Sequence, residues 1–146
     1  MRFHLLLLAL VGFLAPAFLH ADEKAEAEFI ALVREMEASG SMKSVMEIYL
    51  PGDAPSDIAL STHKNIESII SRGIESIGFV EIYPNMKAGL TETMTIAGRD
   101  YVINVDPYKM LEVRYAKKIE GGSSGYSVVV GKKYGRLWIA GFKAVE

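Results

Sequence analysis

The amino-acid sequence predicts an α+β protein, in which three N-terminal helices pack on one face of a curved, mainly antiparallel sheet of about six strands. Two observations predict this fold. Apolar residues recur every three or four positions up to Gly73, as on a helix, and every second position from Ile74 onward, as on a strand. The predicted strands are separated by short turn segments, so strands adjacent in sequence are expected to pair as an antiparallel meander.

The N-terminal stretch has the features of a secretory signal peptide. Arg2 supplies a positive charge ahead of an apolar run from Leu5 to Leu14, and Pro16 ends that run as a helix breaker. The run is shorter than the roughly 20 apolar residues that a membrane-spanning helix needs. We therefore favour a cleaved signal over an uncleaved anchor.

The signal peptide is assigned to residues 1–21, with cleavage after Ala21. Cleavage after Ala17 is the alternative, because Ala15 and Ala17 form a small-x-small pair. The remaining residues, 22–146, have the size of a single domain with one core. We expect this α+β domain to be secreted or periplasmic, with no membrane span in the mature form.

Composition narrows the chemistry of the domain. The chain contains no cysteine, so disulfides, thiol catalysis, cysteine-type zinc sites and lipoprotein acylation are excluded. The formal net charge of −2 is weak, which argues against nucleic-acid binding. We predict no metal site and no cofactor.

The charges are unevenly distributed along the chain. Residues 22–81 contain twelve acidic and five basic residues, whereas residues 82–146 contain six acidic and ten basic residues. Acidic helices lying on a basic sheet would explain this pattern by mutual attraction. The alternative is that the basic half presents a face to an anionic envelope component or small molecule.

The helices are predicted from their apolar stripes and their end signals. In the first helix, apolar residues follow the i, i+3, i+4, i+7 pattern from Phe29 to Met36, and Gly40 ends it. Ser41 is expected to cap a second, methionine-rich helix, and Ser56 opens a third that ends at Gly73. The predicted ranges are 23–38, 42–49 and 56–73.

From Ile74 the sequence is rich in β-branched and aromatic residues at a period of two. Pro84-Asn85, the glycine-serine run 121–125 and the segment from Gly131 to Gly135 are among the turn segments that separate the strands. The predicted strands are Ile74–Tyr83, Leu90–Ile96, Tyr101–Val105, Leu111–Lys118, Tyr126–Val130 and Leu137–Phe142.

The order of helices followed by a curved sheet resembles the NTF2-like (cystatin-like) architecture. The segments that carry the resemblance are 101–104, 111–113, 130–131 and 134–140, which are also similar to a group of small, uncharacterised secreted bacterial proteins. Enzymes of this architecture commonly place an Asp and a His or Tyr inside the cone of the sheet. No such spacing is found here, so the resemblance does not imply catalysis.

The best binding candidate is the predicted hairpin that contains Lys132, Lys133, Tyr134 and Arg136. Three cations and an aromatic ring at an exposed tip suit an anion or a sugar, although hairpin tips are often merely solvated. The favoured function is therefore a non-enzymatic binding or interaction module of unknown ligand.

The alternative function is an NTF2-like hydrolase or isomerase with a pocket on the concave face of the sheet. His63, Glu92 and Tyr101 would be its acid and base groups. His63 flanks the apolar stripe of the third helix, where a half-buried structural role is the simpler interpretation. Glu92 is expected on an apolar strand face, where it needs a cavity or a basic partner such as Arg114.

Overall fold

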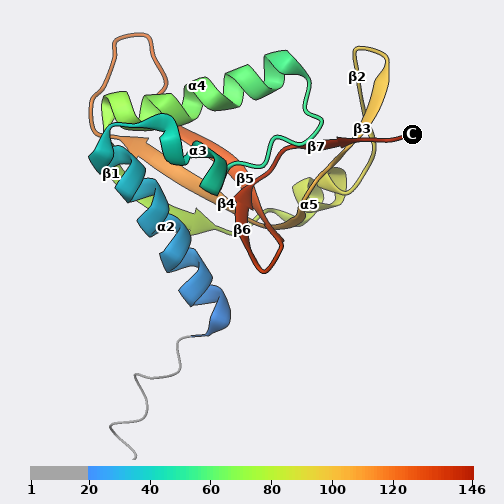
Figure 1. The fold of residues 1–146 in the computed structure, drawn as a ribbon, viewed down its shortest axis with the longest axis horizontal. Coiled ribbons are helices and arrows are strands. Elements are labelled where there is room, and N and C mark those ends of the chain that lie inside the picture. The colour runs from blue at the N-terminus through green and yellow to red at the C-terminus, as the bar shows by residue number, and fades with distance from the viewer. Residues whose placement is uncertain (1–19) are drawn as a thin grey trace, which may run out of the picture.

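A computed structural model describes residues 20–146. Residues 1–19 of the predicted signal peptide, with the alternative cleavage site after Ala17, lie outside the described residues. The described chain is an α+β fold with a curled antiparallel sheet, compatible with the NTF2-like architecture (Figure 1). In chain order the elements are α2 (Ala21–Ser39), the 3-10 turn η2 (Met42–Ser44), α3 (Val45–Ile48), α4 (Ser56–Arg72), β1 (Ile74–Val80), α5 (Pro84–Leu90), β2 (Met94–Ile96), β3 (Arg99–Ile103), β4 (Asp106–Tyr115), β5 (Gly125–Lys133), β6 (Arg136–Ile139) and β7 (Phe142–Ala144).

The three predicted N-terminal helices are present. Helix α2 buries Phe29, Val33 and Met36 and ends at Gly40, whose φ of 63° is the left-handed conformation that glycine adopts most easily. The Ser41 side chain accepts a hydrogen bond from the Lys43 amide. The predicted second helix is divided into η2 and the four-residue α3, because this local cap starts a tighter turn.

Within residues 20–146, seven strands form two antiparallel sheets instead of the single sheet of about six strands that we expected. The larger sheet has the order β1-β4-β5-β6, and the smaller one has the order β2-β3-β7. The predicted strand Leu137–Phe142 is split between them, because the Gly141 amide donates to the side chain of Asn104. The Asn104 side chain in turn donates to the Leu50 carbonyl, and its main-chain amide donates to the Gly141 carbonyl, so Asn104 holds Gly141 at the junction of the two sheets.

Two predictions from the sequence were wrong in the segment that forms helix α5. Pro84 was expected to mark a turn, but it occupies the first turn of α5, where its fixed φ favours a helix. Leu90 was expected to start a strand, but it ends this helix, and β2 begins only at Met94. Sequence periodicity missed α5 because the helix has only seven residues, too few to define an apolar stripe, and buries none of them fully.

The core lies between the helices and one face of the larger sheet. Helices α2, α3 and α4 all cover this face (Figure 1), which agrees with the predicted layering. The buried cluster is formed by Phe29, Val33, Met36, Val45, Ile48, Tyr49, Ile66, Ile69, Ile74, Leu111, Val113, Tyr115, Val130, Leu137 and Ile139.

Among residues 20–146, none of the helices combines the length and the apolar character that crossing a membrane requires.

Candidate functional site

The predicted binding residues lie on the hairpin formed by β5 and β6. Tyr134 and Gly135 alone connect the two strands, with Lys133 paired to Arg136. Their φ values of 53° and 74° identify a type I′ turn, the two-residue connection whose twist matches that of the strands. The Tyr134 side chain stands at the tip and is 76% exposed.

Two of the three cations of the hairpin already have intramolecular partners. Lys132 forms a 2.8 Å ion pair with Asp22 of α2, and its ammonium lies 4.5 Å from the centre of the Tyr108 ring. Arg136 stacks 4.2 Å from the ring centre of Trp138 and donates a hydrogen bond to the Glu47 carbonyl. Asp22 therefore neutralises Lys132, whereas Arg136 keeps its charge because its partners are a main-chain carbonyl and an aromatic ring.

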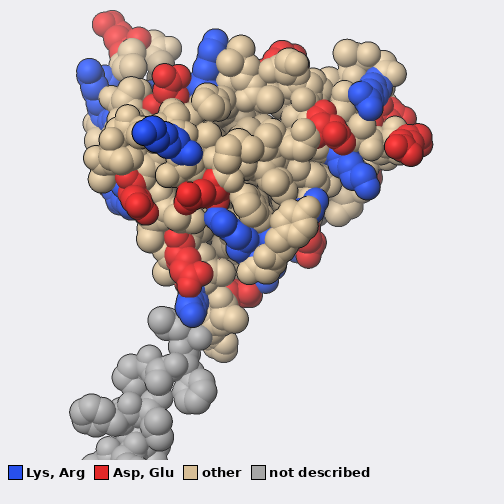
Figure 2. Space-filling model, in the orientation of Figure 1, with Lys and Arg blue, Asp and Glu red and all other residues tan. Residues whose placement is uncertain are grey.

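Lys133 differs from its two neighbours. Its ammonium lies 5.2 Å from the centre of the Tyr134 ring, and it forms no ion pair within residues 20–146. The face of the molecule in Figure 2 carries charges of both signs around its rim instead of one basic patch. Lys133, which is half-buried, and Tyr134, which is exposed, are thus the two hairpin side chains for which no contact with another element is found among the described residues.

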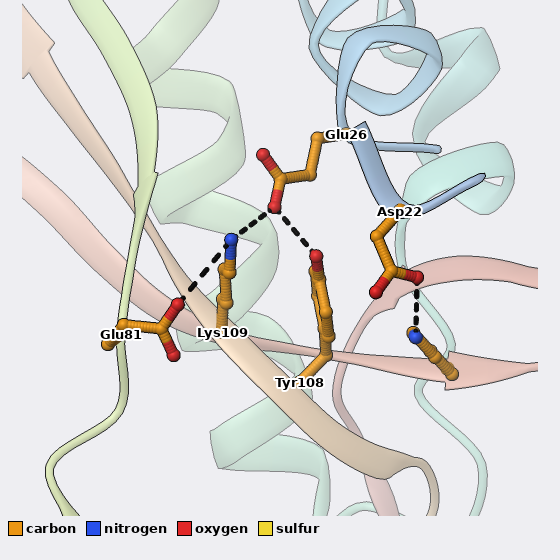
Figure 3. Close-up of polar contacts among 6 residues, drawn as sticks. Asp22, Glu26, Glu81, Tyr108 and Lys109 are labelled. Atoms are coloured by element: carbon orange, nitrogen blue, oxygen red, sulfur yellow. Dashed lines mark hydrogen bonds and ion pairs between the residues drawn. The ribbon is translucent and has the colours of Figure 1, made fainter. Parts of the chain in front are cut away.

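A polar network beside the hairpin ties α2 to the sheet (Figure 3). The Glu26 carboxylate accepts hydrogen bonds from the Tyr108 hydroxyl at 2.7 Å and from the Lys109 ammonium at 2.6 Å. Lys109 also lies 3.5 Å from Glu81. Tyr108 is the extra residue of a β-bulge, because Pro107 pairs with Gly131 and Lys109 with Val130. The bulge lets the two consecutive side chains reach the same carboxylate.

The network shifts the pKa values of its members. Burial raises the pKa of the Glu26 carboxyl, but the hydrogen bonds from Lys109 and Tyr108 outweigh it and hold that pKa below its ordinary value. The hydrogen bond to Glu26 raises the pKa of the Lys109 ammonium. Burial is the largest cause that raises the pKa of the Tyr108 hydroxyl, and the hydrogen bond to the Glu26 carboxylate raises it further. At neutral pH the Glu26 carboxylate is therefore ionised, the Lys109 ammonium is charged and the Tyr108 hydroxyl keeps its proton. In these states both donors are attracted to the carboxylate.

The network accounts for part of the uneven charge along the sequence. Three ion pairs join the acidic part of the chain to the basic part: Glu26 with Lys109, Glu81 with Lys109, and Asp22 with Lys132. The pairs of Asp22 and Glu26 join helix α2 to the sheet, as the expected attraction between acidic helices and a basic sheet predicts, whereas Glu81 lies just after β1. The sequence offers only one signal for it, the i, i+4 spacing of Asp22 and Glu26 on one helix face.

A groove lies between the hairpin and α2. It has a volume of about 270 Å³ and is lined by Ala25, Glu28, Phe29, Leu32, Glu47, Gly135, Arg136 and Leu137. Apolar side chains from α2 and β6 thus meet two carboxylates and the Arg136 guanidinium in one concave site. Sequence reasoning missed it because it forms between segments more than a hundred residues apart.

The three residues of the enzyme alternative lie on separate elements. His63 is exposed on α4, which corrects the half-buried role we expected, and Glu92 is exposed in the turn after α5, on no strand face. Tyr101 is buried in β3, with its ring 6.3 Å from that of Phe142. Within the described part of the chain, no hydrogen bond joins any two of these side chains, and Glu92 forms no ion pair with Arg114.

Metal-ligating side chains do not gather in the described region. Among residues 20–146, no group of three or more His, Cys, Asp or Glu side chains is placed to hold a metal ion.

Comparison with known proteins returned no match: no family model, no curated protein and no solved structure is similar enough to this chain to be matched. The site must therefore be interpreted from its own geometry.

Proposed function

We propose that this protein is an exported, non-enzymatic binding module with an NTF2-like architecture. Its ligand contact is the tip of the β5–β6 hairpin, with Tyr134 supplying an aromatic ring and Lys133 a cation. The enzyme alternative needs two of the side chains of His63, Glu92 and Tyr101 within hydrogen-bond reach of each other in one pocket. Two of these side chains are exposed on different elements, so the binding function has the better support.

The observation that carries this proposal is the conformation of Tyr134. A bulky residue with φ of 53° is strained, and a type I′ turn favours Asn, Asp or Gly at this position. Its side chain is 76% exposed, so little burial offsets the strain. Strained residues that give no stability in return are concentrated at functional sites. A tyrosine here is best explained by contact with a ligand.

The tip suits a ligand that carries a negative charge. The Lys133 ammonium lies beside the Tyr134 ring, so one ligand group can contact the cation while an apolar part stacks on the aromatic face. Lys132 and Arg136 hold the hairpin in place through α2 and α3. We propose an anionic component of the cell envelope as the partner.

Replacing Tyr134 with asparagine is expected to separate binding from stability. The variant Tyr134→Asn should raise the free energy of unfolding by about 0.5 to 1 kcal/mol, because asparagine tolerates the left-handed conformation. The same change should weaken binding to vesicles containing phosphatidylglycerol. Chemical denaturation and vesicle co-sedimentation measure the two effects.

Lys133→Ser should weaken vesicle binding and leave the melting temperature nearly unchanged, because Lys133 forms no ion pair in the described chain. Lys143→Ser, at an exposed position of β7, is the charge-matched control. Vesicles of phosphatidylcholine alone and soluble polyphosphate distinguish a lipid head group from a free polyanion. Undiminished binding by both tip variants would remove the tip from consideration.

Cleavage of the signal peptide predicts the N-terminal residue of the mature protein. The protein recovered from the envelope or the medium should begin at Asp22, or at Phe18 if the alternative site is used. N-terminal sequencing of the mature protein measures this. Recovery of Met1 in a membrane fraction would contradict a cleaved, exported form.

A further inference from the structure

The larger sheet carries a second groove, on the face that is turned away from the helices. Alternate residues of a strand point to opposite faces. Val113 of β4 is buried in the core, so its neighbours Glu112 and Arg114 project from the other face, where both are exposed. We call this groove, which has a volume of about 440 Å³, the sheet groove. Besides these two charged residues its lining includes four serines: Ser76, Ser123, Ser124 and Ser127.

The two charged side chains of the sheet groove are not neutralised within the described chain. Neither Glu112 nor Arg114 forms an ion pair with any of residues 20–146. No other charged side chain of the described residues lines this groove. The side-chain hydrogen bonds that serines donate in this part of the chain come from other serines, so the four groove hydroxyls also lack a partner there. The groove thus offers one cation, one anion and several hydroxyl groups to a ligand.

Small residues surround both charged side chains. The register of β4 with β1 and β5 places two of them beside each charge. The flanking residues are Ser76 and Gly125 for Arg114, and Gly78 and Ser127 for Glu112. A Cβ atom at Gly78 would meet no atom within 4 Å, so the space beside Glu112 is open. A ligand can therefore reach both charges without displacing a bulky neighbour.

The next row of residues across this face is apolar. Met110 lies two residues from Glu112 along β4 and pairs with Val80 and Val129. Val80 is 37% exposed, and the other two are half-buried. Along β4 the face therefore presents a cation, an anion and an apolar row in that order, at intervals of about 6.8 Å.

We propose that the sheet groove binds a dipeptide in its zwitterionic form, with an apolar first residue. In an extended dipeptide the ammonium nitrogen and the carboxylate carbon lie about 6 Å apart, which matches the interval between Glu112 and Arg114. The two charged groups of a single amino acid are only about 2.5 Å apart and are a poorer match.

The order of groups on the sheet also sets the direction of the dipeptide. Its carboxylate accepts hydrogen bonds from the Arg114 guanidinium and from the serine hydroxyls beside it, while its ammonium donates to Glu112. This orientation brings the first side chain nearest to the apolar row, whereas the second lies among serine and glycine residues. The site is distinct from the hairpin tip, because neither Lys133 nor Tyr134 lines the sheet groove.

The probe is leucyl-glycine, titrated into the isotope-labelled protein and followed by amide NMR shifts. We expect the shifts to be concentrated at Glu112, Arg114 and residues 123–127, with a dissociation constant on the order of 0.1 to 1 mM. Glycyl-leucine has the same composition in the reverse order and should bind several-fold more weakly, because its apolar side chain lies at the opposite end. Free leucine should also bind several-fold more weakly, because its charges are too close together.

Two modified dipeptides each remove one charge without altering the protein. Acetyl-leucyl-glycine lacks the ammonium, and leucyl-glycinamide lacks the carboxylate. Each should bind about tenfold more weakly than leucyl-glycine, because charge-assisted hydrogen bonds are lost. Equal binding of the three dipeptides would refute recognition of the zwitterion.

Protein variants assign each charge of the dipeptide to its partner. Glu112→Gln should weaken the binding of leucyl-glycine about tenfold and leave that of acetyl-leucyl-glycine unchanged. Arg114→Gln should weaken leucyl-glycine to the same extent and leave leucyl-glycinamide unchanged. Glu67→Gln and Lys64→Gln, at exposed positions of α4, are the matched controls and should bind as the original protein does. Tyr134→Asn should likewise leave dipeptide binding intact, which separates this site from the tip. Variants that weaken the modified dipeptides as much as leucyl-glycine, or the absence of shifts at both charged residues with several millimolar leucyl-glycine, would overturn the proposal.

Discussion

Replacing Gly141 with alanine is expected to lower the free energy of unfolding by about 3 kcal/mol. A Cβ atom at this position would overlap the carbonyl oxygens of Leu50 and Pro51. Both are main-chain atoms that cannot move aside as a flexible side chain would. Chemical denaturation of the variant measures the loss.

Gly78→Ala is the matched control. Gly78 lies within β1, and a Cβ there would meet no atom within 4 Å. Its alanine variant should be as stable as the original protein or up to about 1 kcal/mol more stable, because alanine restricts the unfolded chain. Equal stability of the two variants would mean that residues 50–51 and 141 do not approach so closely.

The large loss of stability is expected because Gly141 lies where two segments distant in sequence are hydrogen-bonded to each other. The segment after α3 runs beside the end of the chain: the Phe142 amide donates to the Pro51 carbonyl, and the Asp53 amide donates to the Phe142 carbonyl. Asn104 bonds both Leu50 and Gly141. This junction is the point at which the chain passes from the larger sheet to the smaller one.

The sequence predicts well the elements whose stability comes from an apolar face. Helices α2 and α4 follow their stripes, and the change of period at Ile74 coincides with the first residue of β1. It does not predict the division into two sheets. That division depends on the side-chain amide of Asn104 and on the close backbone approach at Gly141, neither of which alters the hydrophobic period.

The candidate site could be predicted only in part. Hairpin residues 132–136 were identified from turn glycines and charge, and the structure shows this hairpin. The partners of its cations could not be foreseen, because Asp22 and Glu47 lie far away in sequence. The bulge that brings Tyr108 and Lys109 to Glu26 adds one residue to a ladder, which a single sequence does not reveal.

Replacing Glu26 with alanine should lower the free energy of unfolding at neutral pH by about 2 kcal/mol, because hydrogen bonds to a charged group are strong and both donors lose their partner. Lys109 keeps the Glu81 carboxylate at 3.5 Å, whereas the Tyr108 hydroxyl has no second partner among the described residues. Glu23→Ala, at an exposed position on the same helix, is the control and should change stability little.

The loss at Glu26 should also depend on pH in a defined direction. The folded protein holds the pKa of the Glu26 carboxyl below its ordinary value of 4.5, so the stabilisation is complete above that value and declines as pH falls through the lower, folded pKa. The difference in stability between the original protein and Glu26→Ala should therefore be constant from pH 7 to about 5.5 and should shrink at lower pH. Denaturation curves at a series of pH values measure this. A difference that stays unchanged down to pH 3 would show that Glu26 acts through packing, with no contribution from the charge that links α2 to Lys109 and Tyr108.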